Sequence, residues 1–186
     1  MSRIPYPVSV PADVQALLAA RPKRNVFRML AHAPALMPGL MELTGAILYR
    51  AKLDPVSREL AVLRVGHLCG SHYEVAQHRK IAAAVGLPQE KVDGTSSDVN
   101  EKLYSKRETL VLRLTEQVVR KTKADDALFA ATVAEFGAEQ TMELIVIIGT
   151  YVMLAQVLEN AEVELEEGGG PAQSDVQKIF GGQAKK

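Results

Sequence analysis

The chain has 186 residues, of which 47% are hydrophobic and 24% are charged, a composition typical of one globular domain with a buried core. Lysine and arginine number 22, as do aspartate and glutamate, so the net charge of zero excludes a strongly basic surface for nucleic acid or an anionic membrane. The single cysteine, Cys69, excludes an intramolecular disulfide and a four-thiolate zinc site within one chain, and it fits a reducing cytoplasm.

The first 50 residues predict an arm followed by short helices. Three prolines among the first eleven residues favour an extended arm, and residues 13–20 follow as a short helix. Between residues 27 and 50, apolar side chains recur mostly at three- and four-residue spacing. This pattern predicts two linked helices, the first ending near His32 and the second starting at Pro34.

A helical hairpin is predicted next. Asp54 is a suitable N-cap and Pro55 suits the first position of a helix that should stop at Gly70. Ser71 then begins a second helix, which Gly86 ends. The two helices would lie antiparallel on either side of Gly70.

The sequence pattern also predicts helices in the second half of the chain. Residues 92–100 are polar and rich in turn formers, which predicts a loop, and the spacing predicts amphipathic helices over 103–122 and 125–136. The most apolar segment, 139–166, contains β-branched residues that suit a strand. We interpret it as a central helix because no second strand-like segment exists to pair with it.

These elements predict an all-α fold, a single-domain helical bundle over residues 25–166. Residues 1–24 form its N-terminal arm and short helix, and the Gly-rich segment 167–186 is expected to be a flexible tail. The longest stretch without charge, 144–158, falls short of the roughly 18 to 20 residues needed to span a bilayer, and the N-terminus lacks the apolar segment of a secretory signal. We therefore expect a cytoplasmic protein without a membrane span.

The candidate site lies on the predicted hairpin. Glu59 precedes Gly70 by eleven residues and His78 follows it by eight, so the two side chains fall within about one helical turn of the same depth. We predict a hydrogen bond between them, directly or through one water. A carboxylate raises the pKa of a histidine and fixes its ring, which suits general acid/base catalysis.

Neighbouring residues leave alternatives open. Glu74 lies four residues before His78 on one helix face, whereas His72 points nearly opposite, so we predict no metal shared by the two histidines. The free N–H groups from Ser71 to Glu74 could hold a substrate carboxylate or an oxyanion. The same two residues form a capping-box pattern, which predicts that Ser71 caps the helix. Each residue could also have a purely structural role. Glu59 would then interact favourably with a helix dipole, His78 would be a core histidine, and Cys69 would be buried and inert.

Farther along the chain, Tyr151 and Gln156 could point from the apolar segment into a pocket.

Residues 58–87 resemble the carboxymuconolactone decarboxylase and alkylhydroperoxidase D superfamily. In its peroxidase branch, a glutamate is followed twelve residues later by the first cysteine of Cys-x-x-Cys, and seven further on by a histidine. Glu59 and His78 occupy the first and last of these positions, whereas Ser71 and Glu74 replace the cysteines. The resemblance rests on Arg58-Glu59, Gly70-Ser71, Tyr73-Glu74, His78 and Gly86-Leu87.

The resemblance implies that Glu59 and His78 are a retained proton-relay pair. The decarboxylase branch lacks the cysteines and removes CO₂ from a lactone acid of aromatic catabolism without metal or organic cofactor. There His78 would protonate the carbon that CO₂ leaves, Glu59 would orient the imidazole, and Ser71, Tyr73 and Glu74 would bind the substrate. Members of the superfamily are all-helical homo-oligomers: dimers, trimers or hexamers.

The sequence therefore predicts a cofactor-independent lyase that acts on a small carboxylated lactone or related acid. One alternative is a thiol-dependent peroxidase that uses Cys69 with an external thiol, which a strongly lowered pKa of that thiol would favour. The other is a non-catalytic binding or oligomerisation module, which the absence of a ligand-sized pocket at His78 would favour.

Overall fold

The computed structural model describes residues 2–166, and every regular element within them is a helix. This confirms the all-α class. The helices are α1 (Ala12–Ala19), α2 (Asn25–Leu30), α3 (Met37–Tyr49), α4 (Pro55–Leu68), α5 (His72–Ala84), α6 (Gln89–Gly94), α7 (Lys106–Lys121) and α8 (Asp126–Ala161). The predicted tail 167–186 lies outside the described residues.

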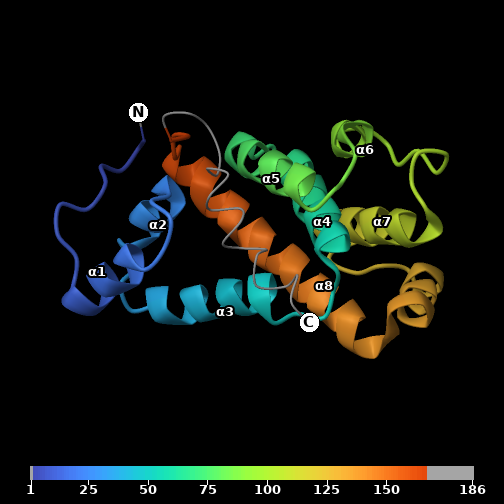
Figure 1. The fold of residues 1–186 in the computed structure, drawn as a ribbon, viewed down its shortest axis with the longest axis horizontal. Helices are drawn as coiled ribbons and strands as arrows, with labels where there is room; N and C mark the ends of the chain where they lie inside the picture. Colours follow the sequence, from blue (N-terminus) through green and yellow to red (C-terminus); the bar gives the residue numbers. More distant parts are fainter. Residues whose placement is uncertain (1, 167–186) are drawn as a thin grey trace.

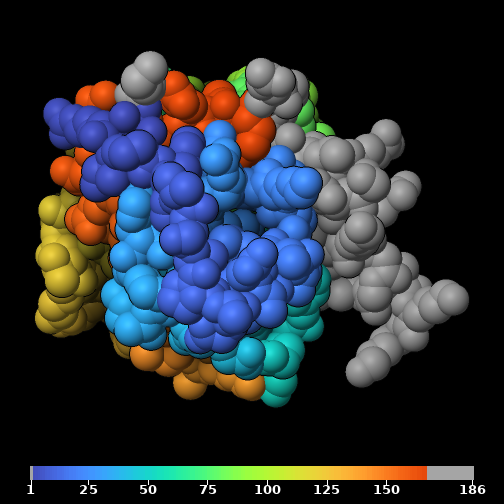
Figure 2. Space-filling model, turned by 90° about the vertical axis from the view of Figure 1, so that its left-hand side faces the viewer, coloured from blue at the N-terminus to red at the C-terminus, as the bar shows by residue number. Residues whose placement is uncertain are grey.

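Helix α8 runs through the middle of the molecule and the other helices are arranged around it (Figure 1). Helix α4 packs against α5, α7 and α8, so four helices share one core. The N-terminal arm and α1 to α3 form a second part, which covers one face of the molecule (Figure 2). The pocket described below lies between these two parts, because its walls come from α2, α3, α5 and α8.

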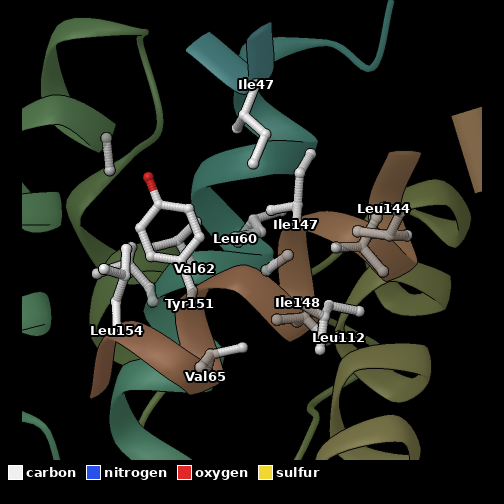
Figure 3. Packing of buried hydrophobic residues seen from close by; sticks show 14 of the residues in the cluster. Ile47, Leu60, Val62, Val65, Leu112, Leu144, Ile147, Ile148, Tyr151 and Leu154 are labelled. Carbon is white, nitrogen blue, oxygen red and sulfur yellow. The ribbon is translucent and has the colours of Figure 1, made fainter. Parts of the chain in front are cut away.

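Helix α8 lies in the middle as predicted, but the most enclosed helix is α4. All residues from 57 to 66 are buried, including the charged Arg58, Glu59 and Arg64. Figure 3 shows Leu60 of α4 beside Ile147 of α8. Full burial of one such leucine or isoleucine stabilises the fold by about 1.5 to 3 kcal/mol. The buried charges of α4 are therefore fixed within a tightly packed core.

Local signals set the hairpin boundaries as predicted. The Asp54 carboxylate accepts a hydrogen bond from the Ser57 N–H at 2.9 Å and caps α4. Gly70 adopts a φ of 68°, a left-handed conformation that favours glycine, at the turn between α4 and α5.

Three predicted boundaries are wrong. The helix expected from Pro34 starts at Met37, because residues 33–36 form turns before it. The predicted loop 92–100 begins inside α6. The helix expected over 139–166 stops at Ala161, because Glu162 is left-handed. The predicted break at Gly137 is present: this glycine has a non-helical conformation (φ 73°, ψ 168°) and divides α8 into two parts.

Among residues 2–166, α8 is long and apolar enough to cross a membrane on length and composition. Half of its apolar window is buried inside the fold, as in the core helix of a globular domain. Helix α8 also packs against α4 and α7. These contacts account for the buried half of the apolar window.

Candidate active site

The hairpin brings Glu59 and His78 into direct contact, as predicted. Nδ1 of His78 lies 2.6 Å from Oε2 of Glu59, a short hydrogen bond between α5 and α4. Gly66 permits this close approach of the helices, since a Cβ atom there would lie 3.0 Å from Cγ2 of Val75. The hairpin therefore fixes the ring orientation and leaves Nε2 as the nitrogen that can react.

Burial and charge act in opposite directions on this pair. Glu59 is 0% exposed, which favours its neutral form, but the charges and hydrogen bonds of His78 and Arg58 outweigh burial and hold the pKa of Glu59 below its ordinary value. Burial likewise disfavours a charged His78, yet the interactions with Glu59, together with the charge of Glu74, raise the pKa of His78. Both shifts favour the charged form of the pair, an imidazolium hydrogen-bonded to a carboxylate.

A second carboxylate lies on the other side of the imidazole. Oε2 of Glu74 is 3.4 Å from Nε2 of His78, and both side chains are buried. Burial, reinforced by the charge of Glu59 and opposed by that of His78, raises the pKa of Glu74 to about 7. Glu74 can therefore gain or lose a proton at neutral pH, where general acid/base groups work best.

The predicted capping box is wrong. The Ser71 side chain makes no capping hydrogen bond to α5, and its hydroxyl is buried without a hydrogen-bond partner among the described residues. Glu74 instead faces His78 on the same face of α5, four residues along the helix. Ser71 is 0% exposed and does not line the pocket, so the geometry gives it no contact with a substrate.

A pocket of about 130 Å³ opens beside His78. Its walls are mainly apolar, and Glu74, Tyr73 and Tyr151 contribute polar groups. The rings of His78 and Tyr151 meet edge to face with centroids 5.0 Å apart, and Figure 3 shows the Tyr151 hydroxyl pointing away from the α8 backbone. The pocket is lined by Arg21, Pro22, Arg24, Val26, Phe27, Thr44, Leu48, Tyr49, Tyr73, Glu74, Gln77, His78, Ile81, Tyr151 and Leu154.

The pocket contains some of the residues singled out in the sequence and excludes others. Tyr73 and Tyr151 line it, whereas Gln156 is exposed elsewhere on α8. The sequence interpretation missed Gln77 and Arg24. Gln77 lies four residues after Tyr73, a spacing that places both on one helix face, whereas no local signal connects Arg24 to α5.

Cys69 lies outside the pocket lining, at the end of α4. Burial and the charge of Glu159 raise the pKa of its thiol, so the reactive thiolate is disfavoured. His72 is exposed, as its spacing from His78 predicts. Within residues 2–166, no group of three or more histidine, cysteine, aspartate or glutamate side chains is arranged to hold a metal ion.

Residues 34–117 match the model of the Carboxymuconolactone decarboxylase family, and this range includes Glu59 and His78. No curated protein matches the chain.

Two solved structures have a similar fold. An uncharacterized peroxidase-related protein from Ralstonia eutropha JMP134, described as an alkylhydroperoxidase AhpD core, aligns with a TM-score of 0.73 and 19% identity over 95% of each chain. ATU0492 from Agrobacterium tumefaciens, a protein of unknown function whose description suggests an AhpD antioxidant defence protein, aligns with a TM-score of 0.68 and 20% identity, covering 77% of this chain and 96% of that one. The family match over residues 34–117 supports the resemblance to the carboxymuconolactone decarboxylase and alkylhydroperoxidase D superfamily that the sequence predicts, and the two solved structures confirm the fold.

Proposed function

We propose that this protein is a cofactor-independent acid/base enzyme that acts on a small carboxylated molecule, such as a lactone acid, in the pocket beside His78. One observation carries the proposal: His78 is held between two buried carboxylates at the wall of a mainly apolar pocket. A structural histidine needs one hydrogen-bond partner, whereas this arrangement tunes a second titratable group, Glu74, to about neutral pH.

The three residues have distinct roles in the proposed reaction. Glu59 accepts the Nδ1–H hydrogen bond and stabilises the imidazolium, and Nε2 of His78 exchanges a proton with the substrate. In a decarboxylation, the bond between carbon and carboxylate breaks, CO₂ leaves, and the electron pair stays on the carbon. His78 then donates its Nε2 proton to that carbon, and Glu74 returns a proton from solvent to the imidazole.

The pocket volume of about 130 Å³ favours a small substrate. Binding pockets for drug-sized ligands measure about 300 to 1,000 Å³. A single five- or six-membered ring with short substituents suits the smaller space, in line with a lactone acid.

A thiol-dependent peroxidase is the second candidate, since the names of both structural neighbours point to peroxide chemistry. The raised pKa of Cys69 and its position outside the pocket lining argue against it. A binding or oligomerisation module without catalysis is the third, and the paired carboxylates at His78 argue for chemistry instead. We also keep cytoplasmic localisation and homo-oligomer formation as predictions; light scattering measures the oligomeric state directly.

The test is a panel of small lactone carboxylic acids assayed for CO₂ release and for deuterium incorporation from D₂O. The wild type should release CO₂ and label the carbon that lost it, and His78→Gln should abolish both. His72→Gln is the matched control, because it changes an exposed histidine on the same helix. His78 is only 6% exposed, so its replacement also costs about 1 to 3 kcal/mol of stability, and turnover must be normalised to folded protein.

Equal specific activity of His78→Gln and wild type would contradict the proposal. Failure of every acid in the panel, combined with efficient peroxide turnover that Cys69→Ser abolishes, would favour the second candidate instead.

A further inference from the structure

The described chain places one of its own carboxylates in a cluster of hydrogen-bond donors at the edge of the pocket. Oε1 of Glu166 accepts hydrogen bonds from the Tyr73 hydroxyl at 2.5 Å and from the Asn25 backbone N–H at 2.6 Å. Oε2 accepts one from Nε2 of Gln77 at 2.5 Å and lies 3.9 Å from Nη1 of Arg24. The Glu166 side chain is only 15% exposed, so these donors enclose it.

The donor cluster belongs to the same pocket as His78. Tyr73, Gln77 and Arg24 all line it. Tyr73 and Gln77 are four residues apart on α5, as are Glu74 and His78, and the two pairs are offset by one residue. Helix α5 therefore presents a row of donors and a row of acid/base groups side by side.

The donor cluster matches an anion in charge and in hydrogen bonding. Arg24 supplies a positive charge, and Gln77 and the Asn25 N–H are neutral donors. Burial, followed by the contact with Glu166, raises the pKa of Tyr73, so its hydroxyl also stays a neutral donor. Tyr73 and Gln77 are 5% and 7% exposed, and burying such donors without an acceptor costs about 1 to 3 kcal/mol each. A carboxylate satisfies all of them at once.

We propose that Arg24, the Asn25 N–H, Tyr73 and Gln77 form a subsite for the carboxylate of a bound acid, and that Glu166 is an internal ligand which this carboxylate displaces. The inference rests on the proposed function for its link to catalysis. A carboxylate in this subsite would place the adjoining carbons of the ligand next to His78 and Glu74.

The segment that carries Glu166 lies outside the helices. It follows the end of α8, where the Val163 N–H bonds to the Leu158 carbonyl, and Nδ2 of Asn25 donates to the Glu164 carbonyl at 3.0 Å. Leu165 is 43% exposed and adds little packing. The segment can therefore leave the donors without unfolding a helix. Because Glu166 is tethered, it competes with free acids at an effective concentration in the millimolar range.

The test measures benzoate binding by calorimetry, with uncharged benzamide as the ligand control. Glu166→Ala and Glu166→Gln should both bind benzoate at least about 10-fold more tightly than the wild type, because neither can place a carboxylate on the donors. Testing both variants separates loss of the carboxylate from loss of side-chain packing. Glu162→Ala is the matched protein control, since that carboxylate pairs with Arg3 instead and should leave benzoate affinity unchanged.

A second step tests the donors themselves. Adding Gln77→Leu to Glu166→Ala should reverse the gain in benzoate affinity, while benzamide binding stays weak throughout. Unchanged benzoate affinity in both Glu166 variants would overturn the subsite, and so would equal gains for benzoate and benzamide.

The same measurements separate the subsite from the proposed function. Tighter benzoate binding by the Glu166 variants of a protein that turns over no acid would support the subsite and overturn the catalytic proposal. Turnover that requires His78 but is unchanged by Gln77→Leu would overturn the subsite and leave the catalytic proposal standing.

Discussion

Replacing Glu74 by glutamine should make the protein more stable than wild type at alkaline pH. Glu74 is 5% exposed and its pKa is raised to about 7 by burial, whereas an ordinary glutamate ionises near 4.5. The folded state therefore binds the Glu74 proton more strongly than the unfolded state does. Wild-type stability falls as pH rises from about 4.5 to 7, since folding must keep an ionised carboxylate in the core. Glutamine keeps the shape and removes the ionisation.

The magnitude follows from the two pKa values. The gap between 4.5 and about 7 corresponds to about 3 kcal/mol once the pH exceeds both. Part of this gain is lost, because Glu74 also helps to raise the pKa of His78, and that stabilising interaction disappears in the variant. The difference in unfolding free energy between Glu74→Gln and wild type should therefore increase by about 1 to 3 kcal/mol, in favour of the variant, as pH rises from 4.5 to 8.

Urea denaturation at pH 4.5, 5.5, 7 and 8 measures this difference. Glu90→Gln is the control, because it removes an exposed carboxylate from α6. A difference between Glu74→Gln and wild type that is the same at all four pH values would refute the reasoning. A variant that loses stability relative to wild type as pH rises would refute it too, since ionised Glu74 would then stabilise the fold through His78.

Three further outcomes are expected. Glu59→Gln should lower turnover less than His78→Gln in the same CO₂-release assay, because it removes the orienting charge but leaves the proton donor; an equal or larger loss would contradict this order. Hydroperoxide reduction with a dithiol reductant should be negligible and the same in Cys69→Ser as in wild type, because burial raises the pKa of that thiol. Gly70→Ala should lower the free energy of unfolding by about 1 to 2 kcal/mol, measured by urea denaturation, because its φ is 68° and no neighbouring atom offers a compensating contact; an unchanged value would contradict the strain argument.

The sequence predicted those features that local chemistry determines. The Asp54 cap and the Gly70 turn depend on neighbouring residues, and they set the hairpin depth that brings Glu59 to His78. The capping-box pattern of Ser71 and Glu74 failed because a partner from the same helix face, His78, competes for the carboxylate. Local spacing shows that the two share a face but not which partner the carboxylate takes.

The features that the sequence did not predict depend on contacts between residues far apart in the chain. Tyr73 and Glu166 are separated by 93 positions in the chain, and no local periodicity indicates that they meet. The burial of α4 on all sides depends on how α5, α7 and α8 pack around it, which an amphipathic pattern in one helix does not reveal. The sequence accordingly placed α8 in the middle of the molecule, as Figure 1 shows, but did not indicate that α4 is the more enclosed helix.

The enclosure of α4 has a consequence for the dynamics of the site. Backbone amides in a helix buried on every side exchange with solvent only when the whole domain opens, whereas those in a segment outside the helices exchange through local opening. Glu59 lies on α4 and Glu166 on such a segment. The amide of Glu59 should therefore exchange orders of magnitude more slowly than that of Glu166. The subsite can then open repeatedly while the proton-transfer geometry stays fixed.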